Sequence, residues 1–168
     1  MNNNSNCETV LNISKENFKF SSAHFLIFDA HRAEMLHGHN YQVRVVIVPN
    51  DQSQTDEKGY FIDFSEIKKH VKDLCDQWDE HILLPQLNSE MKCVKNKNND
   101  DITFRDRFYA FPSNEVIWLQ TKNTSVEELS RLFAENLANK FKAGLLKSIE
   151  VTIEETRGQS ATSFLQLG

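Results

Sequence analysis

The chain has 168 residues, 39% of them hydrophobic and 26% charged, which suits one soluble globular domain with a single core. A formal net charge of −5 gives no general attraction to nucleic acid, so no nucleic-acid partner is expected. No apolar run approaches the length of a membrane span, no signal-peptide core opens the chain, and the three cysteines lack metal-like spacing, so we expect a reducing, cytoplasmic location without membrane attachment.

The amino-terminal third predicts a polar lead-in and two strands. Residues 1–12 begin with a run rich in asparagine and are expected to be disordered, which leaves a single domain over residues 13–168. Strand-like runs then cover about 14–25 and 41–49.

Three histidines are associated with these two strands. His37 and His39 lie two residues apart at the head of the second strand, so their side chains share a face. His24 lies in the first strand, and if the two strands pair, the three imidazoles converge. Three neutral imidazoles with one open position commonly hold a catalytic zinc. A lone His-x-His on a strand is more often an exposed or hydrogen-bonded pair, and it is Gly38 and His24 that favour a metal.

The middle of the chain predicts a hairpin and then a helix. Asp56-Glu57-Lys58-Gly59 resembles a turn that returns through residues 60–63, and Ser65 offers an N-cap. Cys75 is expected to be a packed core thiol and not a nucleophile. The helix itself is indicated by apolar residues three or four positions apart, which are Ile67, Val71, Leu74, Cys75 and Trp78.

The segment beyond Pro85 has a weaker pattern. Two short strand candidates, about 91–94 and 102–110, flank a polar turn at 95–101. Residues 115–120 resemble another strand.

A second helix is predicted to begin near Ser125. Thr124-x-x-Glu127 and Ser125-x-x-Glu128 both fit a capping box. Its apolar stripe consists of Val126, Leu129, Phe133, Leu137 and Phe141.

The last predicted strand, residues 148–156, alternates cleanly. Ile149, Val151 and Ile153 share a face, and Glu155 is the next residue on it. A carboxylate that continues an apolar face needs a partner, although a frayed strand end in solvent fits the pattern equally well. The order of strands and helices predicts an α+β fold with a mostly antiparallel sheet, whose edges and open face invite oligomers.

An ordered set of motifs, from about residue 13 to the end of the chain, resembles one family. It is the 6-pyruvoyltetrahydropterin synthase / 6-carboxytetrahydropterin synthase family; residues 86–114 do not contribute. The motifs are Phe20-Ser21-Ser22-Ala23-His24, Leu36-His37-Gly38-His39-Asn40-Tyr41, Ile62-Asp63-Phe64, Asp79 with His81 and Leu83-Leu84-Pro85, Asn123-Thr124-Ser125-x-Glu127, and Glu155-Thr156.

The resemblance implies the tunnelling fold, in which a four-stranded antiparallel sheet carries two helices on one face. Three subunits would join their sheets into a barrel, and two trimers would stack into a homohexamer with active sites at subunit interfaces. It also implies Zn2+ on the three histidines His24, His37 and His39. The pterin would be held by Glu155, whose carboxylate can accept two adjacent N–H donors as a fork, with Thr124 and Ser125 near the rim.

One departure from the family pattern concerns the general base. Many members carry a cysteine four residues before His-Gly-His, where this chain has Ala33. Glu34, three residues before His37, occupies the position at which a glutamate replaces that cysteine in a variant subgroup known from malaria parasites and some bacteria. The segment around Glu34 resembles that subgroup. Taken without the family, Glu34 would be interpreted as a solvated loop acid.

A second departure concerns the proton relay and the phosphates. The family usually has Leu-Asp-His where this chain has Trp78-Asp79-Glu80-His81, so Asp79 matches and His81 comes one residue late. Either His81 or Glu80 could complete the pair with Asp79. The triphosphate needs cations, for which the candidates are Arg32, Arg157 and Lys19.

The resemblance therefore predicts a zinc-dependent lyase with Glu34 as base. It would cleave the side chain of 7,8-dihydroneopterin triphosphate to give 6-hydroxymethyl-7,8-dihydropterin, a folate precursor. The alternatives are loss of triphosphate to give 6-pyruvoyltetrahydropterin, on the way to tetrahydrobiopterin, and the 6-carboxytetrahydropterin synthase reaction of queuosine synthesis. A non-catalytic zinc- or pterin-binding oligomer is the alternative from a different class.

Overall fold

The computed structural model describes residues 9–50, 57 and 59–167. Most of the predicted disordered segment 1–12 therefore lies outside the described residues, and the first strand begins at Leu11. The elements in chain order are β1 (Leu11–His24), β2 (Ile27–Asp29), β3 (Arg32–Ala33), β4 (His37–Pro49), α1 (Phe64–Trp78), β5 (His81–Pro85), β6 (Lys92–Lys95), β7 (Asn99–Phe104), β8 (Arg107–Pro112), a 3-10 turn η1 (Ser113–Glu115), β9 (Val116–Leu119), α2 (Val126–Ala138), β10 (Leu146–Thr156) and β11 (Gln159–Gln166).

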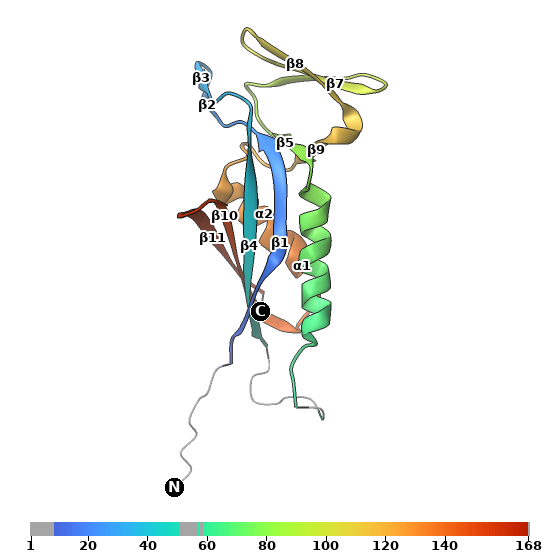
Figure 1. Ribbon diagram of the computed structural model, residues 1–168, viewed down its shortest axis with the longest axis vertical. Coiled ribbons are helices and arrows are strands. Elements are labelled where there is room, and N and C mark those ends of the chain that lie inside the picture. Colours follow the sequence, from blue (N-terminus) through green and yellow to red (C-terminus); the bar gives the residue numbers. More distant parts are fainter. Residues whose placement is uncertain (1–8, 51–56, 58, 168) are drawn as a thin grey trace.

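The main sheet confirms the predicted α+β fold. Its strand order is β11-β10-β4-β1-β5-β9 (Figure 1). The four long strands pair antiparallel, as expected. Two short strands, β5 and β9, extend the sheet in parallel beyond β1.

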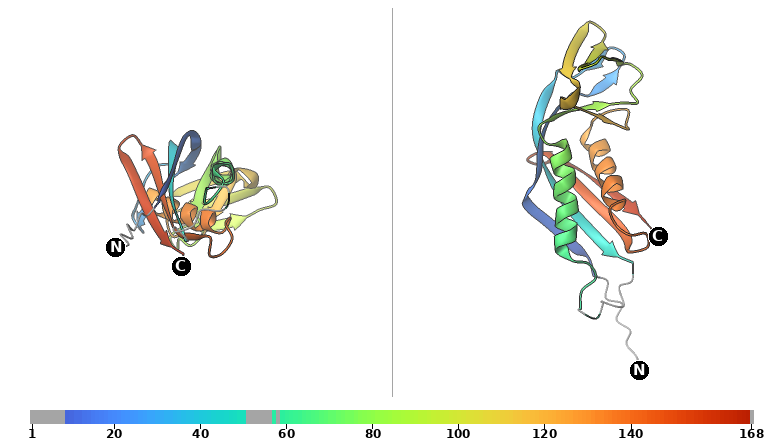
Figure 2. Two further views of the ribbon diagram at one scale, coloured as in Figure 1. Left: turned by 90° about the horizontal axis from the view of Figure 1, so that it is seen from below. Right: turned by 90° about the vertical axis from the view of Figure 1, so that its right-hand side faces the viewer.

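Both helices cover the same face of this sheet (Figure 2). The predicted apolar stripes face the core: Ile67, Val71, Leu74, Cys75 and Trp78 are buried on α1, and Leu129, Phe133 and Leu137 on α2. Val126 is partly buried at the helix start, and Phe141 is buried but lies beyond the helix end at Ala138. Cys75 is fully buried in this core, as predicted, and burial raises the pKa of its thiol to about 12. None of the helices in the described part of the chain is long and apolar enough to span a membrane.

Two local predictions around α1 were wrong. Residues 60–63 bend into the helix and form no strand, while most of the predicted turn before them lies outside the described residues. The N-cap is Asp63 and not Ser65, because the Asp63 carboxylate accepts the Ser65 N–H at 2.7 Å. A side chain that satisfies a first-turn N–H starts the helix where the sequence pattern suggested a returning strand.

The start of α2 also differs in detail. Ser125 is the N-cap, but its side chain makes no capping hydrogen bond. Glu128, its predicted capping partner, instead accepts hydrogen bonds from Thr121 and Arg131. The position was therefore predicted correctly and the capping box was not.

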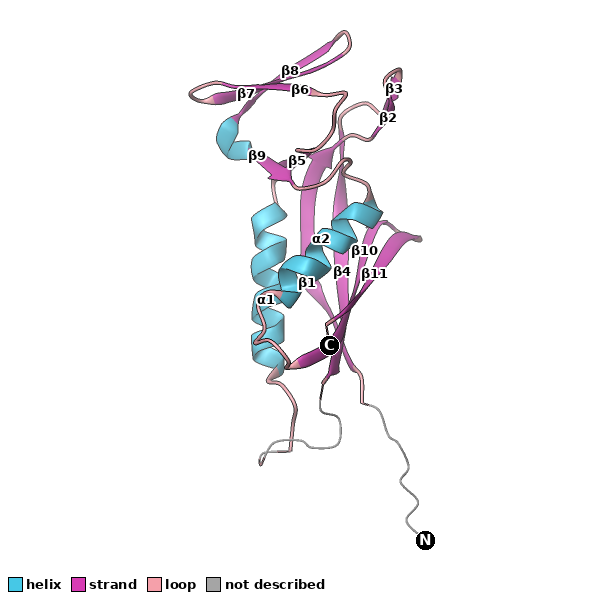
Figure 3. Ribbon diagram, turned by 180° about the vertical axis from the view of Figure 1, so that it is seen from behind, coloured by secondary structure: helices cyan, strands magenta, loops and turns pink. Residues whose placement is uncertain are grey.

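A second, three-stranded sheet lies across one end of the molecule (Figure 3). This outer sheet consists of β6, β7 and β8, where the sequence predicted two strands. The predicted strand 102–110 is broken by a turn at Arg105 and Asp106, and Arg105 adopts a φ of 56°, in the left-handed region. A second, smaller core joins the outer sheet and the β2–β3 segment to β5 and β9 of the main sheet, and it is formed by Phe25, Ile27, Leu84, Met91, Ile102, Phe104 and Val116.

Candidate metal centre and active site

The register of β1 and β4 brings the three histidines together. His24 pairs with His37, and Ser22 pairs with His39. One ligand atom from each imidazole lies within 4.8 Å of the others. A Cβ atom on Gly38 would lie only 3.2 Å from the Ser22 carbonyl oxygen, so glycine suits the close approach of the two strands here. The predicted convergence is confirmed.

Backbone carbonyls orient two of these rings. His24 Nδ1 lies 2.9 Å from the Thr124 carbonyl, and His37 Nδ1 lies 2.8 Å from the Met35 carbonyl. Each Nδ1 then carries the proton, which leaves Nε2 as the ligand atom. Burial lowers the pKa of His24 and favours its neutral form. Neutral imidazoles held in this way fit a zinc ion.

Glu155 has the partners that its place on an apolar face requires. Ile149, Val151 and Ile153 are buried on the same side of β10. Glu155 Oε1 lies 3.3 Å from His24 Nε2 and 3.5 Å from His39 Nε2. The carboxylate thus faces the histidines from the neighbouring strand, and the alternative of a frayed end in solvent does not apply.

Tyr41 completes this cluster and was missed in the sequence. Its ring is fully buried, and its hydroxyl donates to Glu155 Oε1 at 3.3 Å and lies 3.2 Å from His24 Nε2. Burial, followed by the nearby Glu155 carboxylate, raises the pKa of Tyr41 far above its usual range, so the hydroxyl stays protonated. The available signal was its spacing: Tyr41 is two residues after His39 and shares its face.

Glu34 lies on the outer side of the three histidines. It follows β3, and its Oε2 is 4.0 Å from His37 Nε2 with the side chain about one third exposed. The same oxygen accepts the Leu26 N–H at 3.1 Å, while the Glu34 N–H donates to the Leu26 carbonyl at 2.9 Å. The acid chosen from the sequence is therefore held beside the proposed metal ligands.

Asp79 is the C-cap of α1, and His81 is the first residue of β5. Asp79 accepts the Ser21 N–H at 2.7 Å, and His81 Nδ1 lies 2.5 Å from the Asp79 carbonyl. Between them, Glu80 takes a φ of 58°, and its side chain is exposed. His81 lines an open pocket together with Gly38, His39 and Asn40. The structure places both residues along β1, where their hydrogen bonds are to backbone groups.

Thr124 and Ser125 occupy the approach to α2. Thr124 is fully buried, and its contact with the site is the hydrogen bond between its backbone carbonyl and His24 Nδ1. Its hydroxyl donates to the Phe25 carbonyl at 3.4 Å. Ser125 is half-buried at the helix start. Of the predicted phosphate ligands, Lys19 and Arg157 are exposed, and Arg32 stacks over the exposed ring of Phe28 at 4.8 Å.

Sequence comparisons all match pterin synthases. A family model described as 6-pyruvoyl tetrahydropterin synthase matches residues 12–164. A Methanocaldococcus jannaschii protein, provisionally named 6-carboxy-5,6,7,8-tetrahydropterin synthase, is 30% identical over 146 residues, which cover 85% of this chain and 87% of that protein. The 6-carboxy-5,6,7,8-tetrahydropterin synthase of Rickettsia typhi is 30% identical over 106 residues, or 62% of this chain and 72% of that protein.

Solved structures share the fold over nearly the whole chain. The 6-pyruvoyltetrahydropterin synthase of Plasmodium falciparum superposes with a TM-score of 0.87 at 29% identity, covering 96% of this chain and 99% of that one. A variant of the Plasmodium vivax enzyme, in which a glutamate described as the catalytic residue is replaced by alanine, gives a TM-score of 0.87 at 28% identity, with the same coverage.

Proposed function

Because the chain belongs to the 6-pyruvoyl tetrahydropterin synthase family of pterin-processing lyases, we propose that it cleaves the side chain of 7,8-dihydroneopterin triphosphate. The product would be 6-hydroxymethyl-7,8-dihydropterin. The observation that carries this proposal is Glu34 beside His37, with Ala33 where many family members carry a cysteine. The Plasmodium vivax relative, whose catalytic residue is a glutamate, supports the same assignment.

In this proposal His24, His37 and His39 hold a zinc ion. When bound, zinc supplies Lewis acidity toward the hydroxyl groups of the substrate side chain. His24 is supported from behind by Thr124 and His37 by Met35, so both rings are oriented before the metal arrives.

Glu34 would move the protons. Releasing a hydroxymethyl product breaks the bond between the first two carbons of the side chain, so the second hydroxyl must lose a proton and the first carbon must gain one. The other fragment leaves as a two-carbon aldehyde that carries the triphosphate. Glu34 Oε2 is engaged with Leu26, so Oε1 is the oxygen that we expect to accept the proton. Asp79, with His81 or Glu80, would act from the opposite side of the substrate.

Glu155 would anchor the pterin. A pterin presents a ring N–H and an exocyclic amine side by side, and a carboxylate accepts both. Tyr41 holds one oxygen of this carboxylate from the buried side, which fixes its orientation.

The oligomer proposed with this function is a homohexamer of two trimers. The edge strand β11 offers a side for pairing, and its Phe164 side chain is 63% exposed. Light scattering at micromolar concentration should give several times the chain mass of 19.5 kDa. A monomer that turns over substrate would contradict a site shared between subunits.

The decisive test is product analysis. The purified protein is incubated with zinc and 7,8-dihydroneopterin triphosphate, and the pterins are identified by mass. A predominance of 6-hydroxymethyl-7,8-dihydropterin supports the proposal. Stoichiometric binding of zinc and pterin without turnover would instead indicate a non-catalytic binding protein.

A second candidate is the 6-carboxytetrahydropterin synthase reaction, which the names of the archaeal and Rickettsia relatives favour. Loss of triphosphate to give 6-pyruvoyltetrahydropterin is the third outcome. The same incubation separates the three, since each leaves a different substituent on the pterin ring.

A further inference from the structure

Glu34 is in contact with a part of the chain that the family motifs do not include. Arg107, the first residue of β8, donates through Nη1 to the Glu34 carbonyl and through Nη2 to the Ala33 carbonyl, 3.3 Å away. One guanidinium thus spans two consecutive carbonyls. Its planar fork of donors suits this arrangement better than a single ammonium would.

Glu34 is hydrogen-bonded to two other parts of the chain. Leu26, two residues after the proposed metal ligand His24, accepts the Glu34 N–H at its carbonyl and donates its own N–H to the Glu34 carboxylate. Arg107 holds the carbonyl side of the same residue. The direction of the carboxylate toward His37 therefore depends on both contacts.

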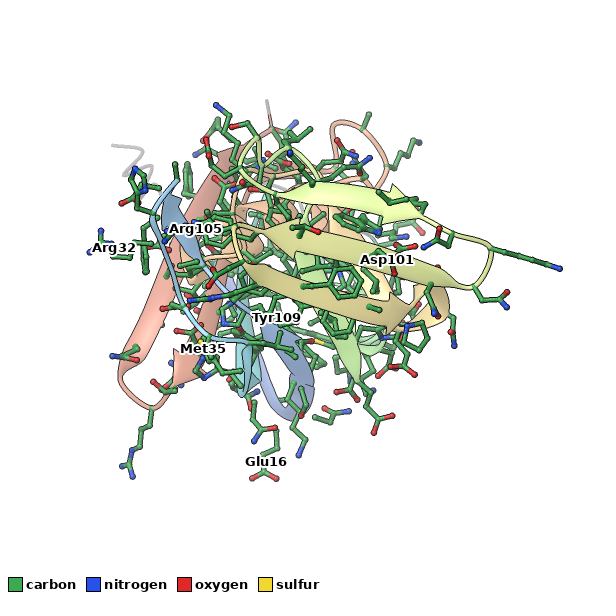
Figure 4. The ribbon with its side chains drawn as sticks, turned by 90° about the horizontal axis from the view of Figure 1, so that it is seen from above. Glu16, Arg32, Met35, Asp101, Arg105 and Tyr109 are labelled. Atoms are coloured by element: carbon green, nitrogen blue, oxygen red, sulfur yellow. The ribbon has the colours of Figure 1, made fainter. Side chains whose placement is uncertain are left out.

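The outer sheet that carries Arg107 is itself firmly attached. The buried Asp100 carboxylate accepts from Trp118 Nε1 at 2.6 Å and from the Ser113 hydroxyl at 2.7 Å, which ties β7 to β9 of the main sheet. Tyr109 stacks on Phe25, the residue after His24, with ring centroids 5.6 Å apart. Figure 4 shows this sheet lying beside the β2–β3 segment. Arg107 therefore has a rigid base.

We propose that Arg107 is a positioning residue, which holds the Ala33–Glu34 backbone so that the Glu34 carboxylate stays aimed at the reacting carbons. This rests on the proposed function, because it assigns Glu34 as the base. A misplacement of about 1 Å in a catalytic group can lower turnover about a hundredfold. Substrate affinity depends on Glu155 and is not involved. The outer sheet is then a functional part of the active site.

The neighbouring Arg105 provides a matched control. It lies on the same β7–β8 hairpin and also donates to a backbone carbonyl, that of His31 at 2.8 Å, but at the tip of the β2–β3 segment (Figure 4). Arg105→Gly removes that contact without backbone strain, because glycine readily adopts a φ of 56°.

The experiment measures zinc content, KM and kcat for Arg107→Ala, Arg107→Lys and Arg105→Gly. We expect Arg107→Ala to lower kcat about ten- to hundredfold with zinc content and KM unchanged. Arg107→Lys, which reaches one carbonyl, should fall in between and also covers the case in which alanine does not fold. Arg105→Gly should stay within about twofold. An equal loss in Arg105→Gly would show that general stapling of the segment is responsible, and would overturn the proposal.

A double variant tests whether Arg107 acts through Glu34. Adding Arg107→Ala to Glu34→Ala should cause no further loss, whereas a separate structural role would lower kcat again. Hydrogen exchange in peptides covering residues 26–36 gives a readout without turnover, and Arg107→Ala should accelerate it. Unchanged exchange would contradict the proposal. Full turnover of Glu34→Ala alone would refute Glu34 as the base, and the exchange result would then still decide whether Arg107 holds this segment.

Discussion

The two halves of the candidate site are built differently. The inner half, with His24, Tyr41 and Glu155, lies on three long neighbouring strands, and the His24 and Tyr41 side chains are buried. The outer half, with Glu34, Asp79 and His81, lies at turns and strand ends, where backbone hydrogen bonds hold each residue. The inner half is thus fixed by strand register and burial, and the outer half by local contacts.

The two halves are therefore expected to have different functions, binding in the inner half and proton transfer in the outer half. The proposed metal ligands and the proposed pterin anchor must keep fixed distances from one another, and they lie on the long strands. Groups that must gain and lose protons lie where the chain is more exposed. Variants in the two halves should therefore affect different measurements, with the inner half changing binding and the outer half changing turnover.

The largest effect should follow the loss of an inner ligand. His24→Ala removes the most buried of the three imidazoles, and we expect it to abolish stoichiometric zinc binding together with turnover. Metal analysis of the purified variant is the measurement. His31→Ala, an exposed histidine at the tip of the β2–β3 segment, is the control and should keep about one zinc per subunit. A full zinc content in His24→Ala would remove His24 from the ligand set.

The next largest effect should come from the outer half. Glu34→Ala should retain zinc and the oligomer while losing about two to four decades of turnover, the usual contribution of general acid–base catalysis. Glu34→Gln should behave alike, because it keeps the size but not the basicity. Glu34→Cys should shift the product toward 6-pyruvoyltetrahydropterin. If Glu34→Ala kept full side-chain cleavage, Asp79 and His81 would be the next candidates for the base.

Glu155→Gln should weaken pterin binding while leaving the metal in place. An amide presents a donor where the pterin also donates, and the lost charged fork should cost about 2–3 kcal/mol. Binding is measured by titration with a pterin, and zinc by metal analysis. Glu154→Gln is the control, since Glu154 is the neighbouring residue on β10 and pairs with Arg44 at 2.9 Å. Loss of zinc in Glu155→Gln would show that this carboxylate is a metal ligand instead.

The smallest expected effect is a pH dependence of stability in the protein stripped of metal. Burial lowers the pKa of His24 in the folded state, so the unfolded state binds more protons below its own pKa of about 6.5. The free energy of unfolding should therefore fall as the pH drops from 6.5, by up to about 1.4 kcal/mol per pH unit for this group. Denaturant unfolding between pH 7 and 5 measures it. His24→Gln should flatten the slope, and an identical slope would contradict the assignment.

The inner half of the site could be predicted from the sequence better than the contacts that hold the outer half. The alternation of side chains along a strand was enough to predict that His37 and His39 share a face and that Glu155 needs a partner. The same rule pointed to Tyr41, which was overlooked because a tyrosine two residues from a histidine is also ordinary core. Arg107 could not be predicted, since its contact with Glu34 joins residues 73 positions apart through a sheet whose strands were wrongly bounded.

The fold was predictable to a similar extent. Both helices and the long strands β1, β4 and β10 have clear apolar periodicity and were found. The edge strand β11 was not predicted, because it has no buried residue and burial left no signal in its sequence. β6 corresponds to the predicted strand at about 91–94, although it is exposed throughout. The turn at Arg105 was missed because its left-handed residue is an arginine and not a glycine.

The pairing of β4 with β1 on one side and with β10 on the other also orders the assembly of the site during folding. The proposed ligands His24, His37 and His39 belong to one short stretch of chain, so a single local loop closure brings them together. Glu155 and the Thr124 carbonyl come from about a hundred residues further along and must wait for the long-range contacts, which form more slowly. A nascent chain would therefore bring the three histidines of the proposed metal site together before Glu155, the proposed pterin anchor, reaches them.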